Sequence, residues 1–287
     1  MRWPSGRAAS VALVLLAAIS IQSGAAVAIS LFDRVGPAGA VLLRNALAVP
    51  VLFALWRPRI AERSASDLRL ALAFGVALGL MNLSIYAAID RLPLGVAITV
   101  EALGPLGVVV VTGRGPLSLL WAGLAGLGVV ALAGPFGGSL DGLGLVFASL
   151  AACAWAAYIV LGQRLGRVYP GASGLTIGVA IAALIQLPTG IASGGADLVA
   201  PEVLAVALVV AALSTVVPYA AEIEALRRLP AATFGVLMSL EPAVAAVIGL
   251  IALDQGLDTG EVIGISLVVA ASVGAIRTAP MATPIIE

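Results

Sequence analysis

The sequence predicts an all-α membrane protein with ten transmembrane helices, and three observations lead to this prediction. First, 61% of the 287 residues are hydrophobic and 10% are charged, whereas soluble domains carry about 25% charged residues. Second, the charges divide the chain into ten apolar runs, and a transmembrane helix needs about 20 such residues. Third, ten helices use about 200 residues, so no sizeable domain remains outside the membrane.

The ten runs differ in whether they contain a charge. Seven carry none and span residues 8–32, 70–89, 115–140, 142–163, 168–196, 203–221 and 262–276. The other three, 35–56, 92–113 and 229–253, each contain one charged residue: Arg44, Glu101 and Glu241 respectively.

The arginines orient the chain. With the N-terminus in the cytoplasm, twelve arginines lie on the inner side, and only Arg34 and Arg91 lie outside. An excess of positive charge marks cytoplasmic loops, so we predict that both termini are cytoplasmic. An alternative for the first run is a secretory signal, because arginines precede it and Ala26-Val27-Ala28 is similar to a cleavage site.

The residue types that are missing exclude several function classes. The chain has no Lys, no His and a single Cys, Cys153. A P-loop, a Schiff base, a zinc site and a His-based triad are therefore excluded, and no cofactor is predicted. The net charge is zero, so nothing in the composition indicates the basic surface that binds nucleic acids.

An intramembrane aspartyl protease is the remaining enzyme alternative, and it needs two buried aspartates. The seven aspartates fall in predicted loops or at helix ends; they are Asp33, Asp67, Asp90, Asp141, Asp197, Asp254 and Asp258. We therefore predict that the protein is not an enzyme.

A motif recurs in the two halves of the chain. Arg91-Leu92-Pro93 is followed by Pro105, and Arg228-Leu229-Pro230 by Pro242, at an offset of 137 residues. Five helices per half is an odd number, so the halves must be inverted relative to each other. We predict a first five-helix unit at 8–137, a second at 138–278 and a cytoplasmic tail at 279–287. Inverted repeats are typical of secondary transporters; an accidental duplication is the alternative.

Ionisable groups inside a membrane are functional candidates because their burial costs several kcal/mol. Arg44 and Glu101 each lie seven residues inside the outer helix end, or about 10 Å deep at 1.5 Å per residue. They can form an ion pair, either structural or functional. Glu241 is about 15 Å deep with no arginine of its own, so hydrocarbon favours its neutral acid. Proton coupling is predicted for Glu241, Glu101 and Glu222, and a structural hydrogen bond is the alternative for Glu241.

The prolines strengthen the assignment of the two deep carboxylates. Pro105 lacks an N–H and frees the carbonyl of Glu101, and Pro242 frees that of Met238. Positions 101 and 238 are equivalent under the 137-residue offset, so Glu101 and Glu241 lie on the same helix face, three residues apart. Two such kinked helices suit an ammonium group or protons; kinks without a ligand role are the alternative.

Further polar side chains lie inside the predicted spans. They are Gln22, Ser23, Asn82, Tyr86, Trp155, Tyr158, Gln186, Ser214, Thr215 and Tyr219. Singly, each suits an interhelical contact. Together they suit a small polar cavity, and six of them complete our predicted substrate site with Arg44, Glu101 and Glu241: Gln22, Asn82, Tyr86, Trp155, Tyr158 and Tyr219. Two glycine pairs, Gly75/Gly79 and Gly260/Gly264, indicate close helix packing or a homodimer.

Several stretches resemble a known family. They are Ser20–Ala26, Val100–Pro105, Pro218–Glu222, Arg228–Pro230 and Thr233–Ala243. Together they resemble the threonine/homoserine exporters of the drug/metabolite transporter superfamily, which have paired EamA-type modules. The resemblance covers nearly the whole chain, and its most specific part is the TFG-x-LMS-x-EPA run at 233–243. Members often carry Gly-Glu at the end of the ninth helix, where this chain has Leu253-Asp254-Gln255.

The resemblance implies a bacterial inner-membrane exporter driven by the proton gradient. Its central cavity would be lined by 8–32, 70–89, 92–113, 142–163, 203–221 and 229–253. Our hypothesis is proton-coupled, alternating-access export of small neutral amino acids, foremost threonine and homoserine. Glu241 would handle the proton or the substrate ammonium, and Arg44 or a helix N-terminus would hold the carboxylate. The alternatives are an exporter of other metabolites or drugs on this scaffold, and a channel or passive scaffold.

Overall fold

Helices account for all regular structure in the part of the chain that the computed structural model describes. It describes residues 7–58, 63–112, 116–133, 140–226, 237, 238 and 240–278. The elements are α1 (Arg7–Ile29), α2 (Phe32–Trp56), α3 (Ala65–Ile89), α4 (Leu94–Glu101), α5 (Leu103–Thr112), α6 (Pro116–Ala133), α7 (Gly142–Val168), α8 (Ser173–Gly194), the 3₁₀ turn η1 (Gly195–Val199), α9 (Pro201–Ala211), the π-helical turn η2 (Ala212–Val216), α10 (Val217–Leu226), α12 (Glu241–Leu253) and α13 (Thr259–Thr278). The all-α prediction is confirmed.

Seven helical segments among the described residues are long and apolar enough to cross a membrane. They are Val11–Ile29, Phe32–Trp56, Ala65–Ile89, Gly142–Val168, Ser173–Val199, Pro201–Glu222 and Thr259–Thr278. Three apolar helical segments are shorter: Leu94–Val108, Leu119–Ala131 and Glu241–Leu253. The predicted total of ten crossings stays a prediction. Arg228-Leu229-Pro230, five of the eleven residues of the 233–243 motif and the tail at 279–287 lie outside the described residues.

Large apolar side chains cover much of the outer surface. Val111 is 84% exposed, Ile251 76% and Leu119 75%. Large exposed apolar side chains in this number suit a surface that faces lipid better than one that faces water. The protein is therefore built to face lipid on its flanks.

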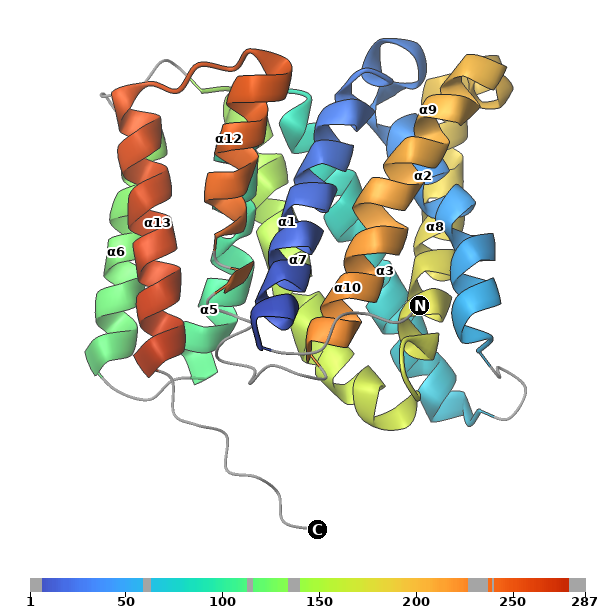
Figure 1. Cartoon of the computed structure of the whole chain (residues 1–287), viewed down its shortest axis with the longest axis horizontal. Helices are drawn as coiled ribbons and strands as arrows, with labels where there is room; N and C mark the ends of the chain where they lie inside the picture. Colours follow the sequence, from blue (N-terminus) through green and yellow to red (C-terminus); the bar gives the residue numbers. More distant parts are fainter. Residues whose placement is uncertain are drawn as a thin grey trace.

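The helices pack in pairs that come from opposite halves of the chain (Figure 1). α3 packs on α7, and α1 packs on α9, η2 and α10. α2 packs on α8, α4 on α12, and α6 on α13. The starts of α1 and α3, the turn between α7 and α8, and the end of α13 lie at one end of the molecule, which we call the inner end.

The glycine pairs serve packing within the chain. A β-carbon on Gly75 would lie 2.6 Å from Cβ of Ile181, and one on Gly79 would lie 3.3 Å from Cα of Ala182, so α3 and α8 touch along their backbones. A β-carbon on Gly128 of α6 would lie 2.9 Å from the carbonyl oxygen of Gly264 in α13. Gly75, Gly79 and Gly264 are thus used inside the protomer, and the homodimer stays a prediction.

The predicted interruption near Pro105 is present. α4 ends at Glu101, a turn residue, Ala102, follows, and α5 begins at Leu103. Pro105 cannot donate to the carbonyl of Glu101, which sits four residues earlier. This break lies beside one of the two deep carboxylates.

Gly104 is expected to be intolerant of any side chain. The carbonyl oxygen of Ala152 in α7 occupies the place where its β-carbon would be. We predict that Gly104→Ala lowers the free energy of unfolding by about 1–3 kcal/mol, as overpacking typically does. The measurement is thermal unfolding of the purified protein in detergent. Gly107→Ala is the matched control, because nothing lies within 4 Å of a β-carbon there; equal effects of the two variants would contradict the prediction.

The departure from the family pattern at the end of α12 has a structural role. Asp254 adopts a left-handed conformation with φ of 53°, a region in which glycine is unstrained. The side-chain oxygen Oε1 of Gln255 accepts a hydrogen bond of 2.9 Å from the backbone N–H of Leu94. Gln255 therefore caps the start of α4 and joins α12 to it.

Asp254→Gly is expected to stabilise the protein. A left-handed conformation costs a non-glycine residue about 1–2 kcal/mol, and glycine loses about 0.5–1 kcal/mol of backbone entropy in exchange. We therefore predict a gain of about 0.5–1 kcal/mol in the free energy of unfolding. Thermal unfolding in detergent measures it, and a loss of stability would show that the Asp254 side chain has an unrecognised role.

Candidate functional site

Arg44 on α2 is the centre of a buried polar group. Its Nε donates a hydrogen bond of 3.0 Å to Oγ1 of Thr215, and its Nη2 donates one of 2.7 Å to the backbone carbonyl of Ser214. Both acceptors belong to the π-helical turn η2, and turns of this type often mark functional sites. These two bonds use two of the five N–H groups of the guanidinium, and the hydroxyl groups of Tyr86 and Tyr219 are near enough to interact with it as well.

Two tyrosines surround this guanidinium. The Arg44 Cζ lies 5.6 Å from the ring centroid of Tyr86 on α3, within the range of a cation–π contact. Tyr219 on α10 also interacts electrostatically with Arg44. Asn82, one helical turn before Tyr86, is buried as well.

The deep carboxylates come together on antiparallel helices. A β-carbon on Gly95 of α4 would lie 2.8 Å from Cα of Ala246 in α12, so the two helices touch there. Toward the inner end, Glu101 follows Gly95 by six residues, and Glu241 precedes Ala246 by five. At 1.5 Å per residue these distances are about 9 and 7.5 Å. The two carboxyl groups therefore lie at nearly the same depth.

Glu222 on α10 joins this group of carboxylates. Glu241 interacts electrostatically with Glu222 and with Glu101, and Glu101 and Glu241 are both buried. Glu241 of α12 thus lies near both Glu222 of α10 and Glu101 of α4. We call these carboxylates, together with Arg44, Asn82, Tyr86 and Tyr219, the polar layer.

The predicted ion pair between Arg44 and Glu101 is absent. Within the described part of the chain, the ion pairs are Arg34 with Asp197 and Glu202, and Arg91 with Asp141. Arg44 affects Glu101 electrostatically, but its hydrogen bonds go to η2. Their equal depth stays a prediction, and the side chain of Arg44 takes its hydrogen-bond partners from η2.

The other predicted site residues are less closely connected. Gln22 on α1 is buried, and its Oε1 has no hydrogen-bond partner in the described structure. Trp155 on α7 is half-buried, and no described contact joins it to Arg44 or to the carboxylates. Tyr158, one turn further along α7, interacts electrostatically with Tyr219 and Glu222.

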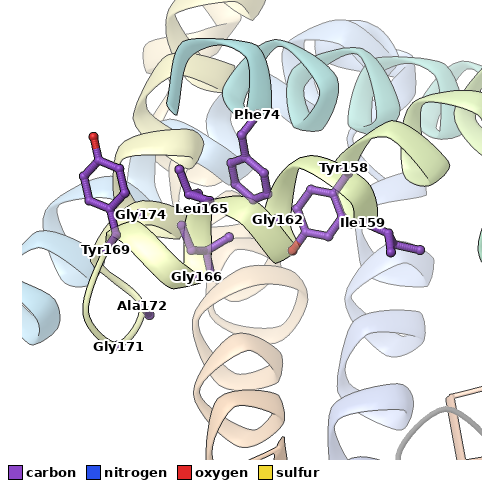
Figure 2. Close-up of a pocket in the computed structure, with 11 residues that line it drawn as sticks. Phe74, Tyr158, Ile159, Gly162, Leu165, Gly166, Tyr169, Gly171, Ala172 and Gly174 are labelled. Carbon is purple, nitrogen blue, oxygen red and sulfur yellow. The ribbon is translucent and has the colours of Figure 1, made fainter. Parts of the chain in front are cut away.

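A pocket of about 250 Å³ lies beside Tyr158 at the inner end (Figure 2). It is lined by α3, α7, α8 and the turn between the last two, with Phe74, Tyr158 and Tyr169 as its aromatic residues. The ring centroids of Phe74 and Tyr158 are 4.7 Å apart. Because Tyr158 contacts the pocket and also interacts with Glu222, it links the pocket to the polar layer.

One polar contact was missed from the sequence. Asn45 donates a hydrogen bond of 2.9 Å from Nδ2 to Oε1 of Gln186, and the Gln186 Nε2 donates one of 3.2 Å to the carbonyl of Gly79. These bonds tie α2, α8 and α3 together directly beside Arg44. Asn45 is a polar side chain inside a predicted span, next to Arg44. The criterion that selected the other polar residues would therefore have selected it too.

Known proteins match this chain along most of its length. The EamA-like transporter family matches residues 142–277. The threonine/homoserine exporter RhtA of Salmonella typhimurium (strain LT2) is 42% identical over 272 residues, which cover 93% of this chain and 90% of that protein. RhtA of Escherichia coli (strain K12) is 42% identical over 274 residues, covering 93% and 91% respectively. A protein of known crystal structure with 18% identity shares the fold, with a TM-score of 0.63 over 93% of this chain and 98% of that one.

Proposed function

Because the chain belongs to the EamA-like transporters and to the family of the threonine/homoserine exporter RhtA, we propose that it exports threonine and homoserine from the cell by proton antiport. It is a multi-pass exporter of the bacterial inner membrane. Our proposal concerns the identity of the substrate and of the coupling ion.

The observation that carries the proposal is the polar layer itself. It contains a guanidinium, two of whose five N–H groups are held by η2, and three carboxylates, of which Glu241 interacts with the other two. An amino acid has one carboxylate and one ammonium group, which need these two kinds of partner. In this arrangement Arg44 binds the substrate carboxylate, and Glu101 or Glu241 binds the ammonium.

Proton coupling follows from the same carboxylates. A buried carboxyl group without a cation beside it is stable as the neutral acid, and an arriving ammonium group stabilises the charged form. Protons and substrate therefore compete for Glu241, with Glu101 and Glu222 as its neighbours. Such competition couples proton movement in one direction to substrate movement in the other.

Alternating access is supported by how the helices pair. If the halves at 8–137 and 138–278 are inverted repeats, the packing of α3 on α7 has its counterpart in the packing of α1 on α9 and α10. The pairs α2/α8, α4/α12 and α6/α13 join equivalent helices. The polar layer takes its residues from α2, α3, α4, α10 and α12, and the pocket beside Tyr158 would provide an approach to it from the inner end.

Transport by purified protein in liposomes tests the proposal. We expect labelled threonine to move against an imposed pH gradient, and homoserine to compete with it. Flux that ignores the pH gradient would overturn proton antiport. No threonine flux, with transport of another metabolite or drug from a substrate panel, would overturn the substrate assignment and favour a different exporter on the same scaffold.

A further inference from the structure

Two polar atoms on one face of α3 lack a hydrogen-bond partner in the described part of the chain, and the Tyr86 hydroxyl is near enough to the Arg44 guanidinium to interact with it. The hydroxyl group of Tyr86 and the Nδ2 of Asn82 are buried without a hydrogen bond in the described structure. The two residues are only 2% and 1% exposed respectively. Buried polar groups are almost always paired in native proteins, and an unpaired one calls for an explanation such as a ligand.

The position of these atoms suits a substrate side chain. Residues four apart on a helix are neighbours, with about 5–6 Å between their β-carbons, so Asn82 and Tyr86 present adjacent polar groups. The Tyr86 ring lies against the Arg44 guanidinium. An amino acid whose carboxylate is on Arg44 would therefore have its side chain beside α3.

The two groups match the hydrogen-bonding capacity of a hydroxyl. The amide N–H of Asn82 can donate to a hydroxyl oxygen, and the phenol oxygen of Tyr86 can accept the hydroxyl proton. Threonine carries its hydroxyl on the β-carbon and homoserine on the γ-carbon. Two adjacent partners can serve both positions, whereas an aliphatic side chain would leave both partners unpaired.

We propose that Asn82 and Tyr86 form a subsite that recognises the substrate hydroxyl group, and that it makes the exporter selective for hydroxylated amino acids. This inference rests on the proposed function. A site built to bond a hydroxyl rejects the analogue that lacks it, because its own polar groups are then left unpaired.

The decisive analogue is 2-aminobutyrate, which is both threonine and homoserine without the hydroxyl. In liposome exchange with labelled threonine, we expect the wild type to favour unlabelled threonine and homoserine over 2-aminobutyrate by at least about tenfold. Asn82→Leu and Tyr86→Phe, which keep the side-chain volumes, should each reduce this ratio severalfold and leave the apparent affinity for 2-aminobutyrate nearly unchanged. Thr189→Val is the matched control, since Thr189 is exposed on α8 and its hydroxyl donates to the carbonyl of Gln186 in the same helix, and the ratio should not change.

The outcomes separate the subsite from the export function. A wild type that does not distinguish threonine from 2-aminobutyrate overturns the subsite and leaves export standing. Equal losses for both amino acids in Asn82→Leu and Tyr86→Phe would show a merely structural role and also overturn it. Thermal stabilisation in detergent provides a binding measurement without flux: selective stabilisation by threonine in a wild type that does not transport it would retain the subsite and overturn export.

Discussion

In Glu241→Gln, threonine efflux driven by a pH gradient should fall at least about tenfold, a ratio that corresponds to 1.4 kcal/mol. Glutamine has nearly the shape of the protonated acid, but it cannot release a proton. Exchange of threonine for threonine should persist, because it needs no net proton movement. Proteoliposomes that contain the purified variant allow both fluxes to be measured on the same preparation.

Glu261→Gln is the matched control for this variant. Glu261 is also buried, but it lies at the start of α13, where its backbone N–H bonds to Asp258 and its carboxylate accepts from the Asp258 N–H. Glutamine can keep that capping arrangement, so proton-driven efflux should remain at the wild-type level. Undiminished proton-driven efflux in Glu241→Gln would contradict the role assigned to Glu241.

In Arg44→Leu, the apparent affinity for threonine should fall by about 10-fold to 150-fold, because a hydrogen bond to a charged group contributes about 1.5–3 kcal/mol. The protein should also lose about 1–3 kcal/mol of stability, since the Ser214 carbonyl loses its donor. Arg44→Lys should fall between wild type and Arg44→Leu, because an ammonium cannot reproduce the planar fork of the guanidinium. The concentration dependence of exchange gives the affinity, and thermal unfolding gives the stability.

Arg34→Gln provides the comparison at the protein surface. Arg34 is exposed and pairs with Asp197 and Glu202 at 3.4 and 3.6 Å, and such pairs contribute about 0–1 kcal/mol. The affinity of the Arg34→Gln variant for threonine should equal that of the wild type. If Arg44→Leu lost stability but kept wild-type affinity, Arg44 would be a structural residue and another group would bind the carboxylate.

The sequence was sufficient for the class of protein and for the residues of the polar layer. A charge that stands alone in an apolar run is costly to bury, so Arg44, Glu101 and Glu241 could be selected without coordinates. The same reasoning placed Asn82, Tyr86 and Tyr219 near them. Depth along a helix follows from residue number, so the sequence could also assign expected levels to Arg44 and Glu101.

Side-chain partners could not be predicted in the same way. The partners of Arg44 lie in the π-helical turn η2. No sequence motif in this chain indicates that the backbone forms a π turn there. Which helix faces meet depends on close backbone contacts such as that of Gly24 with Ser214, where a β-carbon on Gly24 would overlap the Ser214 hydroxyl oxygen. The pocket beside Tyr158 was also missed, because Phe74 and the glycines that line it carry no polar signal.

The turn η2 also makes the length of its helix part of the site. A π turn holds one more residue than the corresponding α-helical turn. Deletion of a single residue there would rotate everything that follows by about 100° and shift it by about 1.5 Å. Within this turn the carbonyl of Leu213 accepts a hydrogen bond from Ser20 of α1, and Tyr219 and Glu222 follow the turn. The extra residue thus sets the register between the contact of η2 with α1 and the side chains of Tyr219 and Glu222, so an insertion or deletion at this point would be more damaging than most substitutions.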